Sequence, residues 1–240
     1  MSVLKIEGVF NVRDVGGMPA EGGRIRVGQL LRSGNLVDAS PAAVAELESL
    51  VAHIVDLRDG QEVASAPSAT KSIATTHLPL FLGSVVSFFT EDLSLEQMYR
   101  QLLEESGERL ADAIRVIAQG NPTLVHCTVG KDRTGVTVAL ALSAVGAQRE
   151  AVIADYALTA SQLPEERNRI VTARLQARHP EAQHAIALAT LSPAEVMRAI
   201  LAEVDERWGS AAEYLRAQGM TESELAALRE VLVESELAPR

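Results

Sequence analysis

The stretch Thr123–Val136, TLVHCTVGKDRTGV, changes character along its length. An apolar run comes first, a polar loop with Gly130 follows, and a second apolar segment begins after Thr134. The only cysteine of the chain, Cys127, stands where the first run meets the loop. A short apolar run bounded by a turn is typical of a buried strand. The stretch therefore predicts a strand that delivers Cys127 to a loop, followed by a helix.

The loop Thr128–Thr134 carries the groups that an oxyanion needs. A loop between a strand and a helix can point successive N–H groups into one cavity, and the helix N-terminus adds partial positive charge. Arg133 offers a planar pair of donors that matches two phosphate oxygens. The same positive field favours a thiolate at Cys127, which is then a nucleophile aimed at phosphorus. The residues predicted to bind phosphate are Thr128, Val129, Gly130, Lys131 and Thr134.

Two other kinds of site fit this loop poorly. The nucleotide-binding P-loop requires GxxxxGK[ST], and here Asp132 follows Gly130 and Lys131. One cysteine beside one histidine lacks the second pair of ligands that a zinc site uses. We therefore expect no metal and no cofactor. The hydroxyl of Thr134 is instead predicted to hydrogen-bond the sulfur and ease its departure.

Composition narrows the class of protein further. The chain has 240 residues, which suits one large domain, and a formal net charge of −10 from 32 acidic and 22 basic residues. This balance argues against nucleic-acid binding, while a local basic pocket for an anion remains compatible with it. A single cysteine allows no intramolecular disulfide and suits a reducing compartment. We expect a cytoplasmic protein, since no standard signal peptide is visible; export by another route would leave no readable mark.

Strand and helix signals alternate along the first half of the chain. Ser40 and Pro41 predict a helix start, residues 52–57 a buried strand, and residues 72–80 another strand. Strands separated by helices predict an α/β fold with a mainly parallel sheet flanked by helices on both faces. From Ser94 onward the chain reads as mostly helical. Capping boxes are predicted for Ser94 with Gln97, Ser192 with Glu195, Ser210 with Glu213, and Thr221 with Glu224.

Ligands of such sheets bind beyond the carboxyl ends of the strands. Two predicted strands end in polar residues, at Asp56–Asp59 and at His126–Cys127. These two strand ends locate a candidate site.

The spacing of His126, Cys127, Arg133 and Thr134 resembles the HCx5R[ST] signature of the protein tyrosine phosphatase superfamily. The fuller HCTVGKDRTG is similar to the bacterial branch typified by a secreted mycobacterial tyrosine and lipid phosphatase. Blocks that also resemble this branch span most of the chain. They are Asn11–Gly17, Leu30–Leu36, Asp56–Val63, Asp155–Thr159 and Tyr214–Leu232.

The resemblance implies a cysteine-phosphatase fold and a two-step reaction without a metal. Cys127 would attack phosphorus, Arg133 and the loop amides would bind the oxygens, and water would hydrolyse the phosphocysteine. The branch also implies breadth over phosphotyrosine, phosphoserine or phosphothreonine, and phosphoinositides.

The sequence offers two candidates for the general acid. The resemblance favours Asp132 within the loop, whereas Asp92 precedes Cys127 at about the interval found in dual-specificity relatives. Each has a plainer interpretation, because Asp132 can simply orient Arg133 and Asp92 suits the start of a helix.

Four further residues and one segment have open roles. Lys131 can meet a second phosphate or pair with an acid such as Asp56 or Glu62. Asp56 and Arg58 are predicted to support the loop or contact substrate, and His126 to be a structural hydrogen-bonding residue beneath it. Residues 164–191 read as two helices broken at His179-Pro180, which we interpret as the helical lid of the resembling phosphatase; an ordinary surface pair of helices is the alternative.

Two rival functions remain at this level. One is a catalytically silent module that binds phosphate, and the other is a different thiol enzyme, a rhodanese-like sulfurtransferase or an arsenate reductase. The combination of Cys127, Arg133 and Thr134 favours the phosphatase, since binding alone does not need a thiol.

Overall fold

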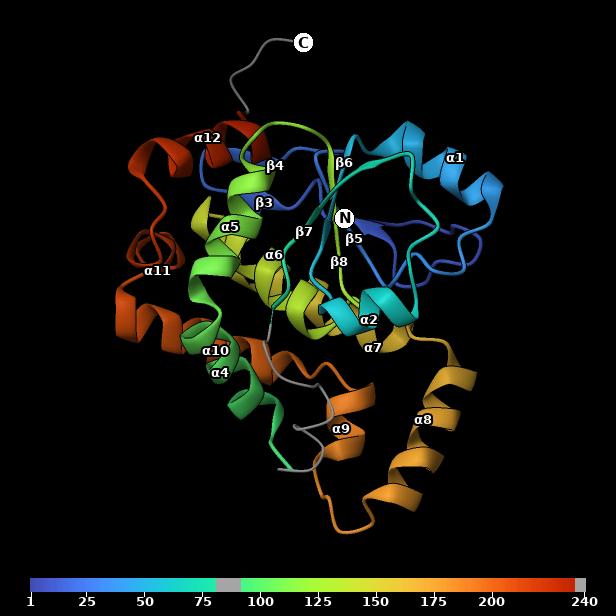
Figure 1. The fold of residues 1–240 in the computed structure, drawn as a ribbon. Coiled ribbons are helices and arrows are strands. Elements are labelled where there is room, and N and C mark those ends of the chain that lie inside the picture. Colours follow the sequence, from blue (N-terminus) through green and yellow to red (C-terminus); the bar gives the residue numbers. More distant parts are fainter. Residues whose placement is uncertain (81–91, 236–240) are drawn as a thin grey trace.

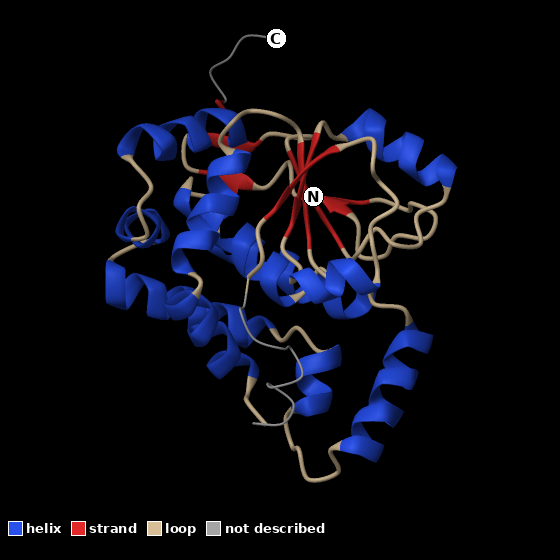
Figure 2. Cartoon of the chain, in the orientation of Figure 1, coloured by secondary structure: helices blue, strands red, loops and turns tan. Residues whose placement is uncertain are grey.

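The computed structural model describes residues 1–80 and 92–235 and contains a six-stranded sheet in the order β1-β2-β5-β8-β6-β7. Neighbours among β5, β8, β6 and β7 run parallel, while β1 and β2 add antiparallel strands at one edge. The predicted mainly parallel sheet is confirmed (Figure 2). The strands span Ser2–Val3, Arg13–Asp14, Leu30–Ser33, Thr123–His126, His53–Asp56 and Ala74–His77 in that order.

Helices cover both faces of this sheet (Figure 1). Alternate residues of a central strand enter different cores, as strand geometry requires: Val55 and Val125 belong to the larger core, Ile54 and Leu124 to the smaller one. Helix α1 (Pro41–Leu50) packs into the smaller core through Leu47. The helices of the larger core are α4 (Leu95–Glu105), α5 (Gly107–Ile117), α6 (Asp132–Ala144), α7 (Arg149–Gln162), α9 (Ala185–Thr190, through Leu188), α10 (Ala194–Trp208), α11 (Ala211–Ala217) and α12 (Glu222–Leu232).

A second, antiparallel sheet lies beside the first and joins the two ends of the chain. Its strands are β3 (Pro19–Ala20), β4 (Gly23–Ile25) and β9 (Val233–Ser235). Because β4 pairs with β9, the N-terminal segment is fixed to the helix α12 that precedes β9.

The predicted helix starts are confirmed except at one serine. The side chains of Ser40, Ser94, Ser210 and Thr221 each accept a hydrogen bond from the backbone N–H three residues later. The full capping box forms at Ser94 and Thr221 but not at Ser210, because Glu213 binds Arg216 instead. The prediction for Ser192 is wrong. Its hydroxyl donates to the carbonyl of Ala157 at 3.0 Å and accepts from the N–H of Ala160 at 2.9 Å, and α10 begins after Pro193 instead.

Two helices extend away from the main body, on the side where β8 leads into α6 (Figure 1). They are α8 (Glu165–Arg178) and α9 (Ala185–Thr190), so the predicted pair of helices is confirmed. A small core of their own, with Leu175, Ala185 and Ala189 at its centre, holds them together. Of the helices described here, none is long and apolar enough to cross a membrane.

Candidate active site

The loop after β8 has the shape that its sequence predicts. Gly130 adopts a φ of +70°, which favours glycine, and a Cβ there would lie 2.1 Å from the carbonyl oxygen of Ser33. The chain can therefore pass against β5 only with glycine at this position. The N–H of Gly130 donates to the sulfur of Cys127 at 3.3 Å, so the loop curves back over the thiol.

One end of the loop is held by Asn35, which follows β5. Its backbone N–H and its side-chain amide both donate to the carbonyl of Thr128, at 3.2 and 3.0 Å. A carbonyl turned outward in this way leaves the neighbouring N–H groups free to face the sulfur side of the loop.

The centre of the loop is held by Asn11 and Arg32. The amide of Asn11 donates to the carbonyls of Val129 and Gly130 at 3.2 and 3.0 Å, and Arg32 Nη2 donates to Gly130 at 2.8 Å. Together with Asn35, these residues bind three successive carbonyls of the loop, those of Thr128, Val129 and Gly130. The loop is preorganised as an anion cradle before any ligand arrives.

Behind these contacts lies a buried cluster of two arginines and one aspartate. Asp155 of α7 pairs with Arg13 Nε at 2.6 Å and with Arg32 Nη1 at 2.5 Å, and all three side chains are at most 2% exposed. Burial and the charge of Arg32 lower the pKa of Arg13 to about 10. Burial alone would raise the pKa of Asp155, but both arginines outweigh it and lower that pKa. The cluster carries a net positive charge behind the loop.

Arg133 is fixed by Glu62 of α2 (Gly60–Ser65). Its Nη1 and Nη2 donate to the two carboxylate oxygens at 2.6 and 2.9 Å, and Nη1 also reaches the carbonyl of Leu57. Burial alone would raise the pKa of Glu62, but Arg133 outweighs it and lowers the pKa to about 2. Thr128 also donates its hydroxyl to Glu62. Glu62 therefore holds the Arg133 guanidinium in one fixed orientation through two hydrogen bonds.

The pairing considered for Lys131 is corrected by the structure. Its ammonium lies 2.6 Å from Asp132 Oδ1 and is almost fully buried. The acids proposed as its partners are bound elsewhere, Glu62 to Arg133 and Asp56 to Arg58. Lys131 and Asp132 are adjacent in the loop and can pair directly. The carboxylates of Glu62 and Asp56 each already bind a guanidinium through both oxygens.

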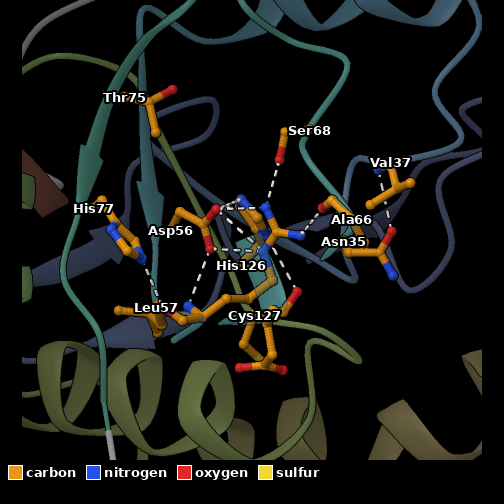
Figure 3. Close-up of polar contacts among 12 residues, drawn as sticks. Asn35, Val37, Asp56, Leu57, Ala66, Ser68, Thr75, His77, His126 and Cys127 are labelled. Atoms are coloured by element: carbon orange, nitrogen blue, oxygen red, sulfur yellow. Dashed lines mark hydrogen bonds and ion pairs between the residues drawn. The ribbon is translucent and has the colours of Figure 1, made fainter. Parts of the chain in front are cut away.

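Asp56 and His126 lie next to Cys127, where the loop begins (Figure 3), and Arg58 binds Asp56. Arg58 Nη2 contacts Asp56 at 2.6 Å, and His126 Nε2 lies 3.6 Å from the same carboxylate. His126 Nδ1 lies 3.1 Å from the carbonyl of Cys127. Burial lowers the pKa of His126 despite the charge of Asp56, which favours the neutral ring.

The two candidate acids have different surroundings. Asp132 begins α6, and Tyr99 donates its hydroxyl to Oδ1 at 2.7 Å. Asp92 accepts the backbone N–H groups of Gln183 and His184 at 2.9 and 2.7 Å, at the start of α9. Asp92 is therefore bound to the outer helical pair.

Thr134 differs from expectation. Its Oγ1 is buried and makes no hydrogen bond to a residue that the structure describes. The bond predicted from Thr134 to the sulfur is absent here, and the N–H of Gly130 occupies the sulfur instead.

For several residues of this site, the sequence did not predict the contacts that they make. Asn11, Arg13, Arg32 and Asp155 lie inside blocks that resemble the phosphatase branch, which was a usable signal. Glu62 stands three residues after Asp59 in a capping-box pattern that also forms. Tyr99 carries no signal, because it reads as an ordinary core residue of an amphipathic helix.

The assembled loop can bind a tetrahedral dianion above a thiol. Backbone N–H groups and the Arg133 fork supply donors, and the buried arginines and the start of α6 supply positive potential. Within the ranges 1–80 and 92–235, histidine, cysteine, aspartate and glutamate form no cluster that could hold a metal ion.

Comparisons with known proteins show which family the chain is related to. Residues 4–234 match the model of a family described as the tyrosine phosphatase family. The triple specificity protein phosphatase PtpB of Mycobacterium tuberculosis is 28% identical over 278 residues, covering 97% of this chain and 100% of that protein. A Cupriavidus necator protein named as a tyrosine-protein phosphatase is 31% identical over 232 residues, covering 89% and 82%. A crystal structure of Pseudomonas aeruginosa TpbA aligns with a TM-score of 0.33 and 18% identity, covering 75% of this chain and 91% of that chain.

Proposed function

We propose that this chain, which belongs to the tyrosine phosphatase family, hydrolyses phosphotyrosine and also phosphoserine, phosphothreonine or phosphoinositide monoesters through a phosphocysteine intermediate. Its class is that of a phosphoric monoester hydrolase. The observation that carries the proposal is the contact between the Gly130 N–H and the Cys127 sulfur at 3.3 Å, because it puts the anion cradle directly over the only thiol.

In the first step, the Cys127 thiolate attacks phosphorus. A sulfur–phosphorus bond forms while the bond from phosphorus to the leaving oxygen breaks. The loop N–H groups and Arg133 hold the three equatorial oxygens, which carry the developing charge. Asp132 donates a proton to the leaving oxygen, so the alcohol departs neutral.

In the second step, water attacks the phosphorus of the phosphocysteine. Asp132, now ionised, takes a proton from the water, and the sulfur leaves as a thiolate. Inorganic phosphate is released and the starting state is restored. Thr134, whose hydroxyl is buried near this loop, can turn toward the departing sulfur.

The assignment of the acid to Asp132 is supported by its place in the loop next to Arg133. The contacts of Asp92 with the amides of Gln183 and His184 support a structural role for that residue. Asp132→Asn should therefore slow a substrate with a poor leaving group far more than one with a good leaving group. An unchanged rate with the poor leaving group would remove Asp132 from this role.

The breadth over substrates rests on the relatives and on Lys131. The triple specificity of the mycobacterial relative is in its name, and Lys131 adds a second cation to the loop. A bound anion with more than one phosphate can compete with Asp132 for this ammonium. We further propose that residues 1–240 act as one phosphatase domain, with residues 164–191 as a lid within it, and that the chain works in the cytoplasm.

A direct assay tests the reaction. Wild type and Cys127→Ser are compared with p-nitrophenyl phosphate, with and without EDTA. We expect EDTA-resistant release of phosphate that disappears with Cys127→Ser. Activity that survives the substitution refutes the mechanism, and phosphate binding without turnover identifies the silent module. A panel of phosphopeptides and phosphoinositides then ranks the substrates.

A further inference from the structure

Two buried tyrosines form a chain of hydroxyl groups behind Asp132. Tyr99 of α4 donates to Asp132 Oδ1 at 2.7 Å, and the hydroxyl of Tyr156 of α7 lies 2.7 Å from that of Tyr99. Both tyrosines are fully buried, and their rings meet edge to face with centroids 6.0 Å apart. Tyr99 has a single hydroxyl proton. If it donates to the carboxylate, it must accept from Tyr156, so the chain has one direction.

The two oxygens of Asp132 are treated differently. Oδ1 accepts the hydroxyl of Tyr99, and it is also the oxygen nearest the Lys131 ammonium, which forms an ion pair with it at 2.6 Å without hydrogen-bond geometry. Oδ2 accepts no hydrogen bond from any residue in the described part of the chain. An oxygen that accepts a hydroxyl and faces an ammonium is the less favourable place for the proton of a carboxyl group. A proton on this carboxyl group therefore resides on Oδ2.

Burial alone does not require this arrangement. Tyr214 is equally buried, and its hydroxyl donates to the backbone carbonyl of Leu103 at 2.8 Å. Tyr99 instead spends its hydroxyl on a carboxylate whose side chain is 22% exposed at the loop. Burial, with the charge of Asp132, raises the pKa of Tyr99 well above its usual range, so the hydroxyl stays a donor at any working pH.

We infer that Tyr99, supported by Tyr156, is a positioning residue for the general acid, which fixes the rotation of Asp132 so that Oδ2 carries the transferred proton. This inference rests on the proposed function. The carboxyl group of a short side chain rotates readily. A fixed rotation matters because proton transfer requires the acid within hydrogen-bonding reach of the leaving oxygen.

The test compares two aryl phosphates that differ in leaving group, phenyl phosphate and p-nitrophenyl phosphate. Phenoxide is a poor leaving group and needs the proton, whereas p-nitrophenoxide needs it much less. With Tyr99→Phe, we expect kcat/KM for phenyl phosphate to fall about tenfold, and for p-nitrophenyl phosphate less than about twofold. Tyr156→Phe should give the same pattern at about threefold, since it acts through Tyr99.

Tyr214→Phe is the matched control, because it also removes a buried tyrosine hydroxyl from its acceptor. Its ratio of the two kcat/KM values should equal that of wild type. In an Asp132→Asn background, Tyr99→Phe should cause no further loss with phenyl phosphate. A full additional loss there would mean that Tyr99 acts without Asp132, and it would overturn the inference.

The remaining outcomes also decide. The positioning role is overturned if folded Tyr99→Phe has the wild-type ratio of kcat/KM for phenyl phosphate to kcat/KM for p-nitrophenyl phosphate. This holds whether both values fall equally or neither changes. If Tyr99→Phe fails to fold, the same ratio measured with Tyr156→Phe decides in its place. A wild type that releases no phosphate from either substrate, or a Cys127→Ser variant that does, contradicts the proposed function itself. Wild-type activity with an unchanged Tyr99→Phe ratio contradicts the inference alone.

Discussion

Replacing Asp155 by asparagine removes the carboxylate that pairs with both buried arginines. Arg13 Nε lies 2.6 Å and Arg32 Nη1 2.5 Å from it, with exposures of 0%, 1% and 2% for the two arginines and the aspartate. The buried cluster changes from one net positive charge to two. Removing one partner from a buried ion pair costs about 3–5 kcal/mol, because the remaining charge stays desolvated.

This loss is large beside the total stability of a domain, which is about 5–15 kcal/mol. For a chain of this size, each kcal/mol lowers Tm by about 2–4 °C, so Asp155→Asn should lower it by about 10 °C. Urea unfolding should show a midpoint lower by about 1 M with an unchanged slope. A loss of less than about 1 kcal/mol would refute the account of Asp155 as the counter-charge.

A matched control uses a pair at the surface. Asp205 pairs with Arg149 at 2.5 Å, but these side chains are 43% and 39% exposed. Asp205→Asn should cost at most about 1 kcal/mol, because solvent screens the pair.

The pH dependence has a defined sign. The folded pKa of Asp155 is lowered, so its contribution is fully present above its unfolded pKa, about 3.9, and is lost as pH falls through the folded value. The unfolding free energy of wild type should therefore fall more steeply below about pH 4 than that of Asp155→Asn. Parallel curves would contradict this.

Three more substitutions have definite expectations. Glu62→Gln removes the charge that fixes the Arg133 fork, and kcat/KM should fall about tenfold; an unchanged value would mean that substrate alone orients Arg133. Gly130→Ala puts a methyl group 2.1 Å from a backbone carbonyl, so the unfolding free energy should fall by more than about 2 kcal/mol, whereas Gly28→Ala, also at positive φ but in open space, should cost about 1 kcal/mol. Asp92→Asn should speed protease cleavage within residues 165–190 and leave the leaving-group dependence unchanged; a much larger loss with a poor leaving group than with a good one would make Asp92 the acid.

The sequence predicts the frame of the site because its signals are local. Apolar runs, glycine at 130 and hydroxyl caps act within a few residues, and they correctly place β8, the loop and the helix start at Ser94. The polar ends of β6 and β8 were expected to meet, and Asp56 and His126 do lie in parallel register.

The missing parts of the site depend on contacts that no local pattern reveals. Glu62 accepts the N–H of Asp59 at 2.9 Å as a cap and also binds Arg133 at 2.6 Å through the same oxygen, and spacing predicts only the cap. Arg13 and Asp155 are separated by 142 positions. Ser192 fits a capping pattern that the fold overrides, since its hydroxyl binds α7.

The hydrogen bonds that hold the loop carbonyls have a consequence for the order of folding. Asn11 and Gly130, which they join, are 119 positions apart, so loop closure must occur before the cradle acquires its shape. Helices α4 to α7 can form from local contacts before the phosphate-binding loop has its final conformation. During refolding, the ability to bind phosphate should therefore return after the helical signal. The N-terminal segment that contains Asn11 completes the active site last.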